Sequence, residues 1–313
     1  MALIRAGCTF DNMSGKFKFD ATGMGASARA LRLGSLILKI LFFGVVVGAF
    51  GFAGGALAAS VDRGDYLVNS IMSCGSCHTP IGPTGFVAEQ ALGGRLVEKT
   101  EQFTAVAPNL TPASRIKDWT DEQLAKAIRE GIRPDGSVIG PPMPFEVYKD
   151  ISDDDLLSVV AYLRTVPAVE NDPGTSEYNI PLPPAWGPPV ASVAAVPEGV
   201  TVEYGAYLSN ALGHCTVCHT KMEGGIAQFD TLLGAGGNEF HGPWGTVVSA
   251  NITPYGLADY TDAQIATMIT DGEMPDGSKL TGPMAFPFYA KMKADDVQAI
   301  VAYLRSMPSI PTP

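Results

Sequence analysis

Apolar residues recur at helical spacing in two stretches of the chain. The first stretch is expected to form a helix that begins at Thr120, where Gln123 completes a capping-box pattern, and ends at Gly131. Its apolar face consists of Leu124, Ala127 and Ile128. A second helix is expected over 152–165, with an apolar stripe made of Leu156, Val159, Val160 and Leu163.

Most of this pattern occurs twice, at an offset of 141 residues. The capping box recurs at Thr261, and the final helix recurs over 295–306. Chance does not hold one register through several separate motifs, so the sequence predicts a duplicated domain. We place the two copies at 60–168 and 200–313.

Each copy is predicted to be a small all-α domain. Short helices are expected near 63–72 and 203–212, and no segment shows the alternation of apolar and polar residues that is typical of a strand. The stretch 169–199 between the copies is rich in proline, which removes amide donors and fixes φ. It is expected to be an extended linker, and its apolar residues, such as Trp186, suggest that it lies along the domains.

The N-terminal stretch 1–59 does not have the pattern of a folded domain. Residues 1–39 are basic, and the next 20 residues, Ile40 to Ala59, carry no charge. Twenty apolar residues suffice for a hydrophobic helix across a bilayer, and the basic flank is expected to stay cytoplasmic. The run ends in an A-x-A pattern, so a cleaved export signal and a retained signal anchor remain alternatives. Either one predicts a periplasmic location, with membrane association at the outer face of the inner membrane.

Charge and cysteine content narrow the function. The net charge of −11 makes nucleic-acid binding through phosphate neutralisation a poor prospect. Four of the five cysteines fall in two matched C-x-x-C-H motifs, Cys74 to His78 and Cys215 to His219. Cys8 has no counterpart in either copy, and we assign it no role.

The C-x-x-C-H spacing is the attachment signal of a c-type heme. Residues three apart share one face of a helix, so Cys74 and Cys77 can both form thioethers with one porphyrin, and Cys215 and Cys218 with another. The histidine that follows each pair, His78 or His219, can bind the iron. We therefore expect two covalently bound hemes c. A redox dithiol or half of a zinc site is the alternative for one motif, but two motifs in register disfavour it.

The sixth iron ligand is expected to be Met143 in the first copy and Met284 in the second. Each lies 65 residues after the histidine of its motif, in a Gly/Pro loop before the final helix. Methionine/histidine ligation raises the heme potential, as suits an electron carrier. Met274 and His241 are alternatives in the second copy. We expect His214, beside Cys215, to face solvent.

The chain resembles the cytochrome c subunits of bacterial membrane-bound alcohol, gluconate and related dehydrogenases. The resemblance rests on the order of C-x-x-C-H-T, Asn-Leu-Thr-Pro, Trp-Thr-Asp-Glu-Gln, Pro-Pro-Met-Pro-Phe and the closing Ala-Tyr-Leu-Arg. It implies two tandem class I cytochrome c domains that take electrons from a dehydrogenase and pass them to quinone, another cytochrome or an oxidase. It also implies that Asn109 and Asn251 lie in a heme-pocket segment, with weak heme contact.

The chain departs from that family in two respects. Its subunits usually carry three hemes, whereas this chain has two motifs. The first motif continues to Pro80 and the second to Lys221, and a proline carbonyl commonly orients the histidine, so support of the two histidines is expected to differ.

We interpret the chain as an electron-transfer protein and not an enzyme. A diheme enzyme, such as a cytochrome c peroxidase or a thiosulfate-oxidising cytochrome, is the alternative, but it needs an open or unusually ligated iron. A heme-based sensor ranks last because no output domain follows residue 308.

Overall fold

The computed structural model describes residues 59–313. Cys8 and, apart from Ala59, the uncharged N-terminal run lie outside these residues, so the expected hydrophobic helix lies outside them too. Within the described part of the chain, no helix combines the length and the apolar character needed to cross a lipid bilayer.

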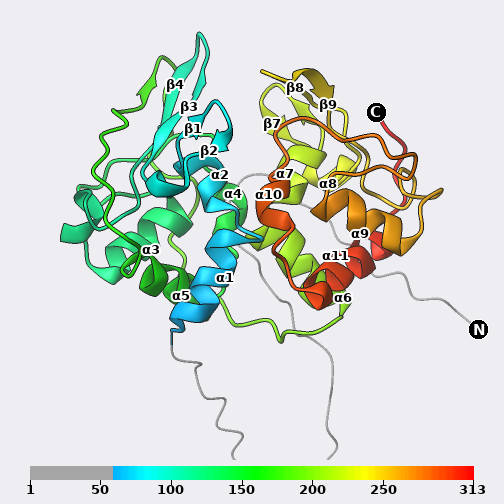
Figure 1. The fold of residues 1–313 in the computed structure, drawn as a ribbon, viewed down its shortest axis with the longest axis horizontal. Coiled ribbons are helices and arrows are strands. Elements are labelled where there is room, and N and C mark those ends of the chain that lie inside the picture. The colour runs from blue at the N-terminus through cyan, green and yellow to red at the C-terminus, as the bar shows by residue number, and fades with distance from the viewer. Residues whose placement is uncertain (1–58) are drawn as a thin grey trace, which may run out of the picture. The chain divides into compact units, whose positions relative to one another are not determined.

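The two copies have matching helices in the same order (Figure 1). The helices of the first copy are α1 (Val61–Asn69), α2 (Cys74–His78), α3 (Asp121–Glu130), α4 (Phe145–Tyr148) and α5 (Asp153–Leu163). Those of the second are α6 (Val202–Ala206), a π-helical continuation η3 (Tyr207–Leu212), α7 (Cys215–His219), α8 (Phe229–Leu232), α9 (Asp262–Thr270), α10 (Phe286–Tyr289) and α11 (Ala294–Ser306). Two short 3-10 helices, η1 (Ala88–Gln90) and η2 (Arg115–Asp118), complete the first copy.

The local helix signals are confirmed. Thr120 and Gln123 form a reciprocal capping box at α3, and Thr261 and Gln264 form one at α9. Gly131 follows α3 in the left-handed conformation, with φ 68°, as expected for a glycine that ends a helix.

The first and last helices of each copy cross at very short range. A Cβ atom on Gly64 of α1 would lie 2.0 Å from the Ser158 carbonyl oxygen of α5, and one on Gly205 of α6 would lie 1.9 Å from that of Ala299 in α11. Only glycine permits this approach. The crossing pairs α1 with α5 and α6 with α11, and it forms the centre of the apolar core.

The all-α prediction is wrong for the loops, which contain short antiparallel sheets. They comprise β1 (Ile81–Gly82) with β2 (Gly85–Phe86), β3 (Arg95–Lys99) with β4 (Phe103–Ala107) and β5 (Glu177–Tyr178), β6 (Met222–Glu223) with β7 (Ile226–Ala227), and β8 (Glu239–Gly242) with β9 (Gly245–Val248). None of these nine strands exceeds five residues, and most of their side chains are exposed or half-buried. The apolar alternation of a half-buried sheet is therefore absent.

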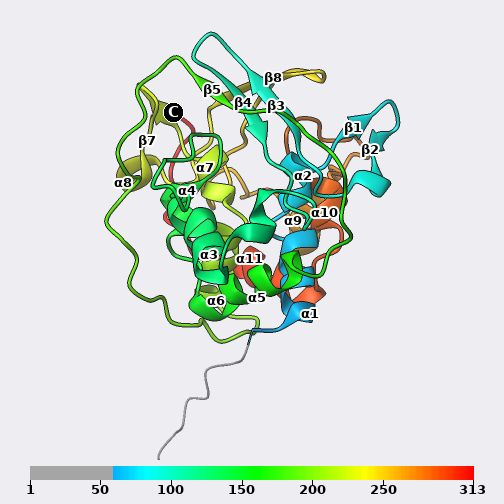
Figure 2. The ribbon, with the colours of Figure 1, turned by 90° about the vertical axis from the view of Figure 1, so that its left-hand side faces the viewer.

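The linker lies along the first copy, as expected, but it also adds a strand. Residues of β5 extend the β3–β4 hairpin, with Tyr178 opposite Phe103 (Figure 2). The Tyr178 hydroxyl donates to the Pro141 carbonyl at 2.8 Å, and Trp186 stacks on Phe145 with ring centroids 6.0 Å apart. These aromatic contacts support the loop that carries Met143.

Candidate heme sites

Each C-x-x-C-H motif forms a short helix of its own, α2 or α7. The residue before each helix, Ser73 or His214, has a left-handed backbone, with φ 46° and 43° respectively. Positive φ is strained for residues other than glycine and is concentrated at functional sites. The matched strain sets the direction in which both helices leave the preceding turn. No sequence signal marked Ser73 or His214 for this role.

The two motif histidines are held in the same way. The Nδ1 atom of His78 lies 2.8 Å from the Pro108 carbonyl oxygen, and that of His219 lies 2.7 Å from the Ala250 carbonyl oxygen. A carbonyl only accepts, so each Nδ1 carries the proton, and each Nε2 keeps its lone pair for a metal. The expected difference between the copies is therefore wrong, because the orienting carbonyl comes from a loop about 30 residues downstream.

Burial keeps both imidazoles neutral. It lowers the pKa of His78 to about 4 and lowers that of His219 as well. A neutral imidazole is the form that binds iron. Each histidine is also fixed through its main chain, because the N–H of Gly94 donates to the His78 carbonyl at 2.7 Å and that of Gly236 to the His219 carbonyl at 2.8 Å.

The four motif thiols are free, and three of them have a raised pKa. Burial raises the pKa of both Cys74 and Cys215 to about 12, and it raises that of Cys218 to about 11. A redox-active dithiol instead needs a lowered pKa that yields a thiolate. Two free thiols and one neutral imidazole on a single helix fit a c-type heme. When bound, that group supplies one-electron redox chemistry at the iron.

Asn109 and Asn251 hold the loops that orient the histidines. The Asn109 amide donates to the Val169 and Asn171 carbonyls, at 2.7 and 3.1 Å, and its oxygen accepts the main-chain and hydroxyl hydrogens of Thr111 at 2.8 Å each. An asparagine side chain offers two donors and two acceptor sites, so its capacity is filled by the protein. Its role is thus to fix Pro108, and the expected weak heme contact is not needed.

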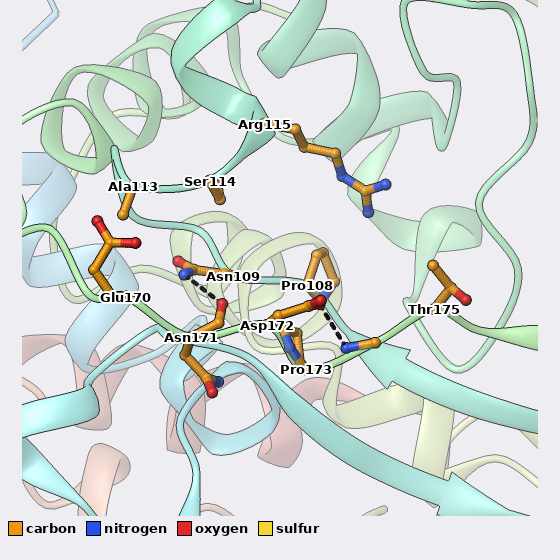
Figure 3. A pocket seen from close by; sticks show the side chains of 11 residues that line it. Pro108, Asn109, Ala113, Ser114, Arg115, Glu170, Asn171, Asp172, Pro173 and Thr175 are labelled. Atoms are coloured by element: carbon orange, nitrogen blue, oxygen red, sulfur yellow. Dashed lines mark hydrogen bonds between the residues drawn. The ribbon is translucent and has the colours of Figure 1, made fainter.

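The second copy repeats this clamp. Asn251 donates to the Ile310 carbonyl at 2.8 Å and to the Thr312 hydroxyl at 3.1 Å, and it accepts from Thr253. Beside the first clamp lies an open pocket of about 570 Å³, on whose wall the Asn109–Asn171 hydrogen bond is visible (Figure 3). None of the expected heme ligands lines this pocket.

Replacing Asn109 with alanine is expected to lower the free energy of unfolding by about 1–3 kcal/mol, because buried partners lose their hydrogen bonds. Asn251→Ala should have a similar effect. Denaturant titration of the heme-loaded protein measures both. Asn179→Ala is the matched control, since the Asn179 side chain makes one exposed hydrogen bond, 2.9 Å long, to the Glu101 carbonyl. An Asn109→Ala protein as stable as this control would contradict the clamp.

The two methionines occupy equivalent positions. Met143 lies two residues before α4 and Met284 two residues before α10. Both are half-buried and pack against the apolar core. The ring of Tyr178 and the stacked Trp186 brace the Met143 loop, whereas a Cβ on Gly282 would meet the Val247 side chain of β9. The copies thus support equivalent loops with different neighbours.

The other candidate residues, His214, His241 and Met274, lie in different surroundings. His214 does not face solvent: its ring packs edge-on against Tyr148 with centroids 6.0 Å apart, and burial lowers its pKa to about 4. His241 lies on β8 with its imidazole 70% exposed and hydrogen-bonded to Thr246. Met274 lies in the loop after α9, where its main chain pairs with Ser278.

Two family models match the chain, one in each copy. The model for cytochrome c oxidase, cbb3-type, subunit III matches residues 59–163, and the model for cytochrome c matches residues 202–308. The chain is 30% identical over 258 residues to a diheme cytochrome c-type protein of Cereibacter sphaeroides, a match that covers 76% of this chain and 82% of that protein.

Cytochrome subunits of dehydrogenases are also similar. The chain is 29% identical over 266 residues to the fructose dehydrogenase cytochrome subunit of Gluconobacter japonicus, covering 80% of this chain and 53% of that subunit. It is 29% identical over 275 residues to the alcohol dehydrogenase (quinone) cytochrome c subunit of Gluconobacter oxydans, covering 81% and 56%. The chain thus spans about half the length of these two relatives.

Proposed function

Because the chain belongs to the family of diheme c-type cytochromes, we propose that it carries electrons in the periplasm from a dehydrogenase to quinone, another cytochrome or a terminal oxidase. The chain is an electron-transfer protein rather than an enzyme, and it binds two hemes c covalently. The observation that carries the proposal is the pair of equivalent attachment helices, each with its histidine held through Nδ1 and its Nε2 left for iron.

We assign Cys74, Cys77 and His78 to the first heme and Cys215, Cys218 and His219 to the second. Met143 and Met284 are assigned as the sixth ligands. Their equivalent places before α4 and α10 support this assignment, as does the separate support of each loop. A soft thioether as the second protein ligand would favour reversible one-electron exchange over reaction with substrate.

A dehydrogenase is the proposed donor. The relatives from both Gluconobacter species are named as cytochrome subunits of dehydrogenases. The acceptor is proposed from the same resemblance. We further propose that the chain consists of an export signal or signal anchor (1–59), two class I cytochrome c domains (60–168 and 200–313) and the linker between them (169–199). This arrangement exposes both hemes on the outer side of the inner membrane.

The proposal is tested with the purified diheme protein. Membranes that contain a substrate-oxidising dehydrogenase should reduce both hemes when the dehydrogenase substrate is added, and omission of that substrate should leave the hemes oxidised. Optical spectra measure the reduction. Rapid turnover of hydrogen peroxide or thiosulfate by the protein, with no reduction by any such membrane, would contradict the proposal and support the enzyme alternative.

Location is tested separately. A reporter enzyme that is active only in the periplasm should be active when it is fused after Pro313. One that is active only in the cytoplasm should be inactive at the same position. The opposite result would overturn the export assignment. Mass spectrometry of the purified chain distinguishes a signal peptide, with a mature start near Ala59, from an anchor that keeps Met1.

A further inference from the structure

The two copies exchange a hydrogen bond through equivalent tyrosines. Within the compact unit that contains residues 59–313, the Tyr207 hydroxyl of the second copy donates to Oδ2 of Asp155 in the first, at 2.8 Å. The Tyr66 hydroxyl of the first copy donates to Asp296 in the second. Tyr66 and Tyr207 are 141 residues apart, as are Asp155 and Asp296. In each domain, therefore, the same tyrosine donates a hydrogen bond to the other domain, and the same aspartate accepts one from it.

Each tyrosine also accepts a hydrogen bond from the start of the helix it touches. The main-chain N–H of Ser152, which caps α5, donates to the Tyr207 hydroxyl at 3.1 Å. The N–H of Lys293, which caps α11, donates to the Tyr66 hydroxyl at 3.1 Å. The carboxylate in each case is the third residue of the helix. A hydroxyl from the other domain thus bridges the two groups that a capping box would join directly.

The contact is buried and charge-supported. Asp155 is 8% exposed and Asp296 is 3% exposed. Arg63 of α1 binds Asp155 through two hydrogen bonds, of 2.8 and 3.0 Å, and donates to the Tyr204 hydroxyl of the other copy at 3.2 Å. Removing a hydrogen-bond donor from a buried carboxylate lowers the free energy of unfolding. Each tyrosine is thus held in the interface by a buried carboxylate that needs the hydrogen bond of its hydroxyl.

At the same interface, each heme-attachment helix, or the residue just before it, packs against a helix of the other domain. A Cβ on Gly75, between the cysteines of α2, would lie 2.8 Å from the ring of Phe288 in α10, and Phe288 meets Phe86 edge-on with centroids 5.3 Å apart. In the reciprocal position, Tyr148 of α4 packs edge-on against His214, the residue before α7. Both views place α2 beside α10 and α4 beside α7 (Figures 1 and 2).

The segment just before the second motif also contacts the first copy. A side chain larger than glycine at position 213, just before the second motif, would meet Ile71 of the first copy at 2.8 Å. Both attachment helices, whose cysteines would hold the two hemes, therefore lie next to this contact.

We propose that Tyr66 and Tyr207 are positioning residues, which hold the two attachment helices at the separation that sets the rate of electron exchange between the two hemes. The inference rests on the proposed function. In the step, one electron leaves the ferrous iron of one heme and reduces the ferric iron of the other. No bond forms or breaks and no proton is needed, so the protein's part is to fix the distance.

The test uses the heme-loaded full chain with Tyr66→Phe, Tyr207→Phe and the double variant. The matched controls are Tyr162→Phe and Tyr303→Phe, because these tyrosines lie on α5 and α11 and accept hydrogen bonds from Asn69 and Asn210 of their own copies, at 2.7 and 2.9 Å. The rate is read from nuclear magnetic resonance exchange between oxidised and reduced heme signals in half-reduced protein, extrapolated to zero concentration to remove exchange between molecules.

We expect the double variant to slow intramolecular exchange about tenfold, the factor that 1.4 kcal/mol represents, and the controls to stay within about twofold. Heme potentials and spectra should not change. Hydrogen exchange should show that Tyr207→Phe exposes the Ser152 amide and Tyr66→Phe the Lys293 amide. This second measurement is independent of electron transfer and confirms that each cap was removed.

Two results would overturn the proposal. If the double variant kept the rate of electron exchange between the hemes while both amides were exposed, the tyrosines would not be positioning residues. The single variants decide the point if the double variant does not fold. If the electron-exchange rate of the unmutated protein extrapolated to zero at zero protein concentration, electron transfer between the two hemes of one molecule would be excluded. The function as an electron carrier would stand. Hemes that no dehydrogenase-containing membrane can reduce would instead refute the proposed function itself.

Discussion

A protein carrying Cys215→Ala and Cys218→Ala is expected to retain one covalently bound heme instead of two. The four thiols lie on two separate helices, so loss of one pair removes both thioethers of a single porphyrin and leaves the other pair untouched. Intact mass after acid extraction of non-covalent ligands measures the result. Cys74→Ala with Cys77→Ala should give the complementary protein.

The control for this experiment is Ser76→Ala, which changes the first motif without removing a thiol. It should keep both hemes. The assignment would be contradicted by a quadruple cysteine variant that still carried covalent heme. It would also be contradicted by an unmutated chain whose mass showed one heme.

Met284→Ala is expected to open the second iron, lower the potential of that heme and let it bind carbon monoxide. In the proposed assignment, the loop before α10 would bring the thioether to the heme without relying on the weak iron–sulfur bond, and loss of the sulfur would leave a coordination position that external ligands can fill. Met143→Ala should do the same to the first heme. Carbon monoxide difference spectra and a spectroelectrochemical titration measure the two effects.

Met222→Ala is the matched control, because Met222 is exposed on β6 and has no equivalent methionine in the first copy. It should leave both potentials unchanged. If Met284→Ala altered neither the carbon monoxide binding nor the potentials, Met274 and His241 would be the next ligands to test. The argument for a catalytic second heme would then regain support.

Signals that act over a few residues were predictable from the sequence. The Thr120–Gln123 capping box and the left-handed Gly131 depend on contacts within one turn, and both were found. The attachment helices followed from the i, i+3 spacing of the cysteines. The hairpins were missed because strands such as β8, with largely exposed side chains, need no apolar alternation.

Contacts between distant main-chain and side-chain atoms could not be predicted in the same way. The Pro108 and Ala250 carbonyls orient the histidines, but a main-chain carbonyl leaves no signature in residue identity. The repeated asparagines one residue later were visible, although their role in clamping the loop was not. Tyr66 was recognisable as a repeated residue, yet its partner Asp296 lies 230 positions away in the other copy.

The near-infrared absorption of the oxidised, unmutated protein tests the central claim most directly. Methionine-ligated ferric heme has a weak sulfur-to-iron charge-transfer band in this region, and the band is absent when the sulfur is not bound. With absorption normalised to heme content, we predict a band for each of the two hemes, so that Met143→Ala or Met284→Ala removes half of the intensity. A spectrum without the band, or one that a single methionine variant abolishes completely, would contradict the account of two closed, electron-carrying irons.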